Sequence, residues 1–411
     1  MLTPLRNPTY RKLFCAQVVA LVGTGLLTIA LSLQAYDFAG SHAGTILGTA
    51  LTIKILMYVL AAPIISAAAQ RLPVAVVLVG ADAVRIAIAL VLPLVDNAVS
   101  LYLAIAVLQA ASATFTPAFQ ALIPKVLPGE RDYTAALSLS RLAYDLEAIA
   151  SPILAAGALF VVSYHGLFMG TAGGFLGSLL LVVAAARSLP ARGDTGRQEP
   201  FRKRTLQGVR LMVRVPELRG VLWLNFAVAA PMAMVLVNTV VIVRTTFQWD
   251  DAVLAWLFAA FGAGSMLIAL VVPRLRERFG DYSLMLAGGG ASIGGMALLY
   301  LTLVGEAVWA LWALWPVLGA ALALMQIPMS QVLRLHIAEK DLDAVFAAQF
   351  SLSHACYLVA YPLAGWAGSE VGPAWATLVL MLIGLCGVLL SAYTSLSARQ
   401  FEQTLAVPTH Y

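Results

Sequence analysis

Long apolar segments alternate with short polar connections along almost the whole chain. Most of these segments reach the ~20 residues that a helix needs to cross the hydrocarbon core of a bilayer. Proline, glycine and charged residues separate them and indicate where the helices end. In the first half we predict helices near residues 13–36, 44–69, 74–93, 100–122, 134–161 and 166–187. In the second half we predict helices near residues 218–243, 252–273, 283–304, 308–332, 344–367 and 373–396.

This pattern predicts an all-α membrane protein with twelve transmembrane helices in two six-helix, pseudo-symmetric bundles. The first apolar segment has no small-residue cleavage site before its end, so we expect a membrane span there and no cleaved signal peptide. The expected parts are an N-terminal bundle over residues 1–187, a cytoplasmic linker over 188–217, a C-terminal bundle over 218–396 and a cytoplasmic tail over 397–411. Within the linker, basic and apolar residues alternate from Phe201 to Val213, as in an amphipathic helix on an anionic membrane surface.

The composition supports a lipid environment. Hydrophobic residues make up 61% of the 411 residues and charged residues only 11%, whereas charged residues are about 25% of soluble proteins. The net charge of +5 arises from basic residues gathered in alternate connections, so it gives no reason to expect a nucleic-acid partner. This bias places both termini in the cytoplasm of a bacterial-type inner membrane, with the lipid bilayer as a partner.

An internal repeat supports two related halves. The segment Pro117–Gln120 resembles Pro328–Gln331, and Ser138–Arg141 resembles Ser351–His354. Because the helices follow the same order in both halves, the repeat indicates a parallel duplication. In transporters this plan places the solute site between the two halves.

Several charged residues lie inside the predicted spans, where each costs about 2.5 to 3.5 kcal/mol on insertion scales. Lys54 lies ten residues into its helix, about 15 Å deep. It is a candidate partner for substrate or protons, and the alternative is a snorkelling or structurally paired lysine. Asp82 and Arg85 are three residues apart, so we predict a structural ion pair.

The fifth helix contains Arg141, Asp145 and Glu147, of which the first two have the spacing of a mutual pair. Glu147 lies roughly 200° around the helix from Asp145. It is therefore a candidate for proton coupling or substrate contact, or alternatively for a salt bridge with another helix, for example with Lys54. His354 occupies the repeat position of Arg141 and is either a titrating group or a hydrogen-bonded structural residue.

Two motifs resemble those of the major facilitator superfamily, and the resemblance covers nearly the whole chain. Glu277, Arg278 and Gly280 are similar to its cytoplasmic loop motif, and only Arg71 remains at the equivalent place in the first half. Ser151 and Pro152 are similar to part of its antiporter motif in helix 5. The resemblance implies the major facilitator fold.

Other segments narrow the resemblance further. The segments Phe115–Pro124 and Asp82–Arg85 look most like the drug and enterobactin exporter branch. The segment Tyr144–Glu147 is similar to that of its nickel-resistance relatives.

We therefore predict a secondary transporter that exports a small solute or ion by alternating access, coupled to protons and not to ATP. No phosphate-binding loop, cofactor motif or metal-ligand spacing occurs in the sequence. The first alternative is divalent-metal export, as in the nickel-resistance relatives. A membrane enzyme or scaffold is the alternative from another class, but no catalytic constellation supports it.

Overall fold

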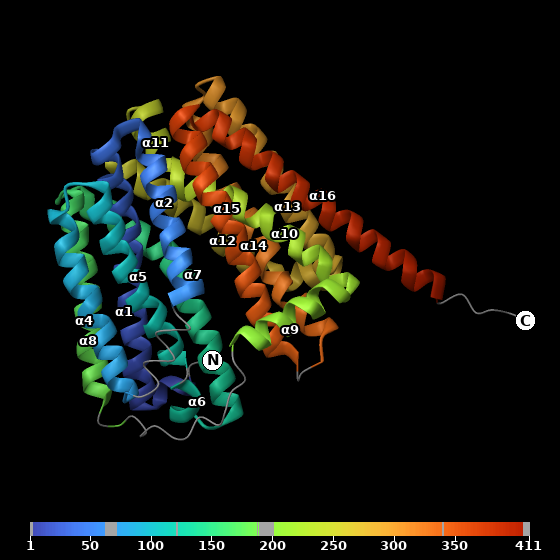
Figure 1. Cartoon of the computed structure of the whole chain (residues 1–411), viewed down its shortest axis with the longest axis horizontal. Helices are drawn as coiled ribbons and strands as arrows, with labels where there is room; N and C mark the ends of the chain where they lie inside the picture. Colours follow the sequence, from blue (N-terminus) through green and yellow to red (C-terminus); the bar gives the residue numbers. More distant parts are fainter. Residues whose placement is uncertain are drawn as a thin grey trace, which may run out of the picture. The chain divides into compact units, whose positions relative to one another are not determined.

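A computed structural model describes residues 3–61, 72–120, 122–186, 188, 201–338 and 341–405. Within these residues every regular element is a helix, as Figure 1 shows. The elements up to residue 186 are η1 (Thr3–Arg6), α1 (Pro8–Ala39), η2 (Gly40–His42), α2 (Ala43–Leu56), η3 (Met57–Ala61), α4 (Val74–Val91), η4 (Leu92–Leu94), α5 (Ala98–Gln120), α6 (Ile123–Val126), α7 (Glu130–Leu159) and α8 (Tyr164–Ala186).

The remaining helices follow residue 200. They are α9 (Phe201–Arg214), α10 (Pro216–Ala233), η5 (Met234–Asn238), α11 (Thr239–Val241), η6 (Ile242–Thr246), α12 (Asp251–Phe279), α13 (Asp281–Val304), η7 (Val308–Ala310), α14 (Leu311–His336), α15 (Leu342–Glu370) and α16 (Pro373–Leu405). Of the elements labelled η, η3, η5 and η6 are π-helical and the other four are 3-10 helices.

Ten helical stretches in the described part of the chain are long and apolar enough to cross a membrane. The first, Pro8–Leu60, contains both α1 and α2. The predicted fold class, an all-α membrane protein, is confirmed. Several ends differ from the prediction; for example, α1 begins at Pro8, α12 ends at Phe279, and α16 continues past residue 396 to Leu405. Ala398, Arg399 and Gln400 favour helix, so the polar residues at this end extend the helix beyond the apolar span.

The chain divides into two compact units. Unit 1 contains Met1–Gln198 and Val240–Ala259, and unit 2 contains Glu199–Thr239 and Ala260–Tyr411. The end of the seventh predicted span and the start of the eighth therefore pack with the first half of the chain. The division at residues 239 and 240 falls between the π-helical segments η5 and η6.

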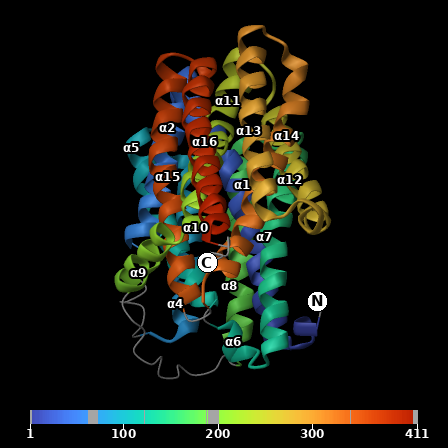
Figure 2. The same cartoon turned by 90° about the vertical axis from the view of Figure 1, so that its right-hand side faces the viewer.

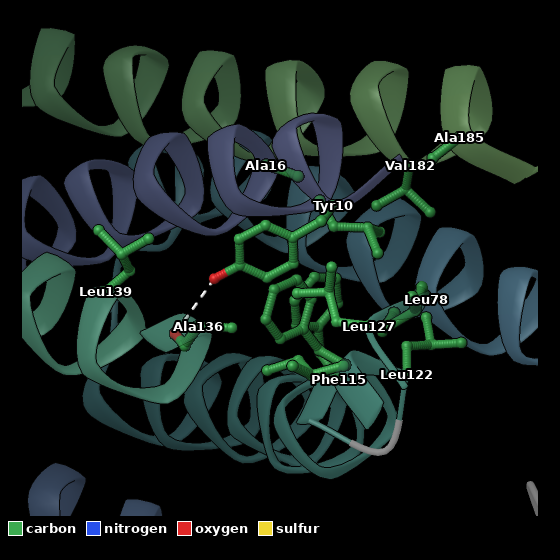
Figure 3. Packing of buried hydrophobic residues seen from close by; sticks show 14 residues of the cluster. Tyr10, Ala16, Leu78, Phe115, Leu122, Leu127, Ala136, Leu139, Val182 and Ala185 are labelled. Atoms are coloured by element: carbon green, nitrogen blue, oxygen red, sulfur yellow. Dashed lines mark hydrogen bonds between the residues drawn. The ribbon is translucent and has the colours of Figure 1, made fainter. Parts of the chain in front are cut away.

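Unit 1 is built around α1, which packs against α7 and α8, while α4 packs against α5 and α8. Asn7 caps the start of α1 because its side chain accepts hydrogen bonds from the backbone N–H groups of Thr9 and Tyr10. Tyr10 is fully buried and donates a 3.1 Å hydrogen bond to the carbonyl of Ala136, as Figure 3 shows. This bond satisfies the phenol within an apolar cluster and joins α1 to α7.

The contact between α1 and α8 requires glycine. A Cβ at Gly174 would lie 2.9 Å from the carbonyl oxygen of Val19 and 3.0 Å from the Cα of Gly23. The backbones of the two helices therefore approach too closely for a larger residue, as is typical of helix pairs in membranes.

In unit 2, α9 lies beside α15, as Figures 1 and 2 both show. A Cβ at Gly208 of α9 would lie 1.9 Å from the carbonyl oxygen of Ala344. Gln207 donates a 2.9 Å hydrogen bond to Asp341, and Met212 is fully buried. A helix thus occupies the predicted amphipathic segment, and part of its surface packs on protein.

Candidate functional site

A buried ion pair joins two residues of α4. Arg85 Nη2 donates to the carboxylate of Asp82, three positions earlier on the same helix face. Ser178 of α8 donates a 2.7 Å hydrogen bond to the other carboxylate oxygen. Asp82 is fully buried and Arg85 is only 4% exposed. The pair lowers the cost of two charges within a membrane-spanning helix.

Two aromatic rings hold the Arg85 side chain in place. Its guanidinium carbon lies 4.3 Å from the ring centroid of Phe115 and 4.5 Å from that of Phe175. Both distances are within the range of cation–π contacts. Among the described residues, the buried Arg85 Nε has no hydrogen-bond partner. The guanidinium is thus fixed by α4, α5 and α8.

Arg85 lines a cavity of about 240 Å³ inside unit 1. The cavity lies among α1, α2 with η3, α4 and α5. Besides Arg85, six lining residues have polar groups, and the rest are apolar. The lining residues are Gln17, Ala20, Leu21, Thr24, Lys54, Tyr58, Arg85, Leu108, Gln109, Ser112 and Phe115.

Lys54 and Arg85, distant in sequence, thus line the same cavity. Lys54 lies near the end of α2, which continues as the π-helix Met57–Ala61 and carries Tyr58 into the lining. Insertions of this kind are frequent at functional sites. The cavity combines two cationic groups with neutral donors in an otherwise apolar bundle, an arrangement suited to binding a polar solute.

Unit 2 contains a second cavity, of about 410 Å³, with a largely neutral lining. Asn225 of α10 and Gln349 of α15 both line it and exchange two hydrogen bonds, of 2.8 Å and 3.3 Å. Gln326 and Ser330 of α14 also belong to the lining. The amides link α10 to α15 and offer donors and acceptors for a solute.

The predicted His354 lines this second cavity. Its Nδ1 lies 2.7 Å from the carbonyl oxygen of Phe350. Because a carbonyl only accepts, Nδ1 carries the proton in this contact. The rings of Phe350 and Tyr357 lie against the imidazole, at centroid distances of 4.0 and 6.2 Å. His354 is therefore oriented by its own helix.

A polar cluster joins the end of α1 to the residues around η6. Tyr164 donates a 2.6 Å hydrogen bond to Asp37. Arg244 forms a 3.0 Å ion pair with Asp251 and lies 5.3 Å from the ring centroid of Tyr36. All five residues belong to unit 1. The contact of Arg244 with Tyr36 attaches the segment Val240–Ala259 to the rest of that unit.

The predicted loop motif follows the end of α12. Glu277 and Arg278 are exposed, and Gly280 has a φ of 75°, a conformation that favours glycine. Its N–H bonds to the carbonyl of Arg276 at 2.9 Å. Arg276 also pairs with Asp281. The glycine thus turns the chain, and the pair holds α12 against the start of α13.

Four of the predicted residues cannot be placed. Arg71 lies outside the described residues. Arg141, Asp145 and Glu147 lie on α7, but their side chains are outside the described part of the structure. Their roles therefore stay predictions.

The two residues of the helix-5 motif are described. Ser151 and Pro152 are buried in α7, and Pro152 lies inside the helix. Ser151 Oγ has no hydrogen-bond partner in the described part of the chain. The small serine side chain and the proline ring both face other protein atoms, as the packing role of the motif requires.

Three amides that line the cavities were not predicted as site residues from the sequence. Gln17 and Gln109 line the first cavity and Asn225 lines the second. The available signal was an amide within an apolar span, and polar contact between helices explains such an amide equally well.

No group of three or more His, Cys, Asp or Glu side chains suited to a metal ion occurs among the described residues. The cavity linings agree with this, because their donors are mainly amides, hydroxyls and cations. Such donors suit an organic solute better than a transition metal.

Comparison with known proteins gives a family match. The model of the Major Facilitator Superfamily matches residues 13–332 and, in a second match, 221–403. No curated protein matches.

Many solved structures share the fold. A structure of a variant of the nucleoside transporter NupG is 14% identical, with a TM-score of 0.73 over 94% of this chain and 99% of that one. A bacterial homolog of the human lysosomal transporter Spinster, in an inward-facing and unoccupied conformation, is 14% identical, with a TM-score of 0.72 over 98% of both chains. A POT family transporter in complex with 5-aminolevulinic acid is 11% identical, with a TM-score of 0.73 over 95% of this chain and 96% of that one.

Proposed function

The chain belongs to the major facilitator superfamily, and we propose that it is a secondary transporter that exports a small solute in exchange for protons. The observation that carries this proposal is the cavity of unit 1, in which Lys54 and Arg85 line a space within apolar helices. Charged groups inside a membrane span are costly, so their presence around a cavity favours a role in solute passage.

The neutral cavity of unit 2 supports the same proposal. Asn225, Gln349 and His354 supply hydrogen-bonding groups there, beside the rings of Phe350 and Tyr357. Each unit thus has a polar cavity between its helices. We propose alternating access as the transport mechanism, because it is typical of this repeat plan.

Proton coupling is assigned to Glu147 on the basis of the sequence. Asp145 has a partner at the right spacing on its own helix, Arg141, whereas Glu147 faces another direction. A carboxyl group in apolar surroundings binds a proton more readily than in water. Glu147 is therefore the proposed proton carrier, in a chain with both termini in the cytoplasm of an inner membrane.

The test uses the purified protein in liposomes that contain a pH-sensitive dye. A panel of organic solutes and divalent cations is applied to the wild type and to Glu147→Gln. We expect proton flux that depends on one class of solute and is lost in the variant. Solute movement without proton flux, equal in both proteins, would contradict the coupling, and no movement of any solute would contradict the transport function.

The same panel decides between organic-solute and divalent-metal export. Nickel or cobalt flux in the absence of organic-solute flux would favour the metal exporter. The described residues supply no ligand cluster for such an ion, so we expect the organic solutes to give the signal.

A further inference from the structure

The helix α9 packs on protein through the face that contains Gly208, which lies against the backbone of Ala344. Successive residues of an α-helix are rotated by about 100°. Leu206, Arg210 and Val213 therefore lie close together on the opposite side of the helix. Leu206 and Val213 are each 52% exposed, and Arg210 is exposed as well. Apolar and basic side chains thus face outward together.

Arg214 extends this exposed surface by one turn. It follows Arg210 by four residues and is also exposed. Neither arginine forms an ion pair with any carboxylate that the structure describes. Because like charges four residues apart on a helix repel each other, a negatively charged group beside them would lower the free energy of this surface. We refer to Leu206, Arg210, Val213 and Arg214 as the outer face of α9.

The outer face lies where two membrane spans begin in unit 2. Arg214, the last residue of α9, precedes the first residue of the span Glu217–Thr246 by three positions. Gly208 packs against the first residue of the span Ala344–Glu370. The helix is thus attached to the starts of both spans, near the boundary between the headgroups and the hydrocarbon core of a bilayer.

A third guanidinium lies at the end of α9. Arg219, in the first turn of α10, donates a 2.7 Å hydrogen bond from Nε to the carbonyl of Val213. This bond satisfies a carbonyl at the C-terminal end of α9. Arg219 is also exposed, so it adds its charge to that of Arg210 and Arg214 at this end of the helix.

Exposed apolar side chains beside arginines are typical of a helix that lies in the surface of a bilayer. Guanidinium groups bind phosphate through charge-assisted hydrogen bonds. We propose that the outer face of α9 binds an anionic phospholipid, with Arg210 and Arg214 at its phosphate and Leu206 and Val213 against its acyl chains. A soluble acidic ligand would leave the two apolar side chains in water, whereas a lipid covers both kinds of group. This binding is independent of the transported solute.

The test measures lipid binding to the purified full chain in detergent by native mass spectrometry, which resolves each bound lipid. The probes are dioleoylphosphatidylglycerol, which is anionic, and dioleoylphosphatidylcholine, which has the same acyl chains but no net charge. A single arginine near an anionic lipid surface gives about a fivefold preference. With Arg210 and Arg214 together, we expect the wild type to bind its tightest anionic lipid about thirtyfold more strongly than the zwitterionic one.

Three double variants assign the preference to the outer face. Arg210→Gln with Arg214→Gln is expected to abolish the preference for the anionic lipid without changing binding of the zwitterionic one. Arg210→Lys with Arg214→Lys keeps both charges and is expected to keep most of the preference. Arg6→Gln with Arg11→Gln removes two exposed arginines at the start of the chain. It is the matched control and is expected to bind both lipids like the wild type.

A further double variant tests the apolar part of the site. Leu206→Gln with Val213→Gln is expected to weaken binding of both lipids, because contact with acyl chains does not depend on the charge of the headgroup. The soluble compound sn-glycerol 3-phosphate, which has the phosphate without acyl chains, is expected not to displace the anionic lipid at equal concentration.

Four results would overturn the proposal. They are equal affinity of the wild type for the two lipids, an unchanged preference in Arg210→Gln with Arg214→Gln, unchanged binding in Leu206→Gln with Val213→Gln, and displacement of the lipid by sn-glycerol 3-phosphate. The last result would identify a site for a soluble phosphate compound.

Discussion

The phenol of Tyr164 donates a 2.6 Å hydrogen bond to the carboxylate of Asp37, and this bond links the start of α8 to the end of α1. The two helices also share the tight glycine contact between Gly23 and Gly174. One bond and one backbone contact thus fix both the end and the middle of the same helix pair.

Removal of the Tyr164 hydroxyl tests how much this hydrogen bond contributes to the free energy of unfolding. We expect Tyr164→Phe to lower the free energy of unfolding by about 1 kcal/mol, because the carboxylate is exposed and regains water. Tyr300→Phe is the matched control, since the Tyr300 ring meets Trp375 edge-on. Equal stability of Tyr164→Phe and the wild type in thermal unfolding would show that water replaces the phenol without loss.

Gly174 and Gly173 form a matched pair for the helix contact. A Cβ at Gly174 meets the backbone of α1, whereas a Cβ at Gly173 meets nothing within 4 Å. Gly174→Ala is expected to cost about 1 to 3 kcal/mol as overpacking. Gly173→Ala should raise stability by about 0.5 to 1 kcal/mol because alanine favours helix. Thermal unfolding of both variants checks the difference, and the same sign in both would contradict the predicted contact.

The buried pair of Asp82 and Arg85 predicts strong coupling. Asp82→Leu or Arg85→Met alone leaves an uncompensated buried charge and should cost about 3 to 5 kcal/mol. The double variant removes both charges and should be more stable than either single variant. The stabilities of the wild type, the two single variants and the double variant are compared through expression level and unfolding temperature. Additive losses in the double variant would show that the residues act independently.

The ion pair of Arg244 and Asp251 predicts a weaker effect at the segment Val240–Ala259. Its side chains are about one-third exposed, so solvent screens the pair, and a double-mutant cycle should give a coupling of about 0.2 to 1 kcal/mol. Hydrogen exchange of this segment is expected to rise in Arg244→Gln, because the contact with Tyr36 is also lost. Unchanged exchange would mean that other contacts hold the segment to unit 1.

The sequence predicted the helices well because each apolar segment has the length that a bilayer requires. It also predicted that Asp82 and Arg85 face each other, since their spacing fixes the helix face. The spacing of residues within one helix does not determine which helices become neighbours. The shared cavity of Lys54 and Arg85, and the rings of Phe115 and Phe175 around the guanidinium, therefore required the structure.

The same limit on prediction from the sequence applies to the amides that line the cavities. Gln17 and Asn225 are amides within apolar spans, and nothing local distinguishes an amide that lines a cavity from one that bonds to a neighbouring helix. Only the positions of α5 around Gln17 and of α15 around Asn225 make that distinction.

The division of the chain into its two units has a practical consequence for making the protein in pieces. Cutting the chain near residue 198, in the connection between the halves, would leave Val240–Ala259 on the second fragment although it packs with the first. The first fragment would then lack the contact of its Tyr36 ring with Arg244. For two co-expressed fragments to assemble, the second would have to pack its segment Val240–Ala259 onto the first, as domain-swapped proteins do with an exchanged element.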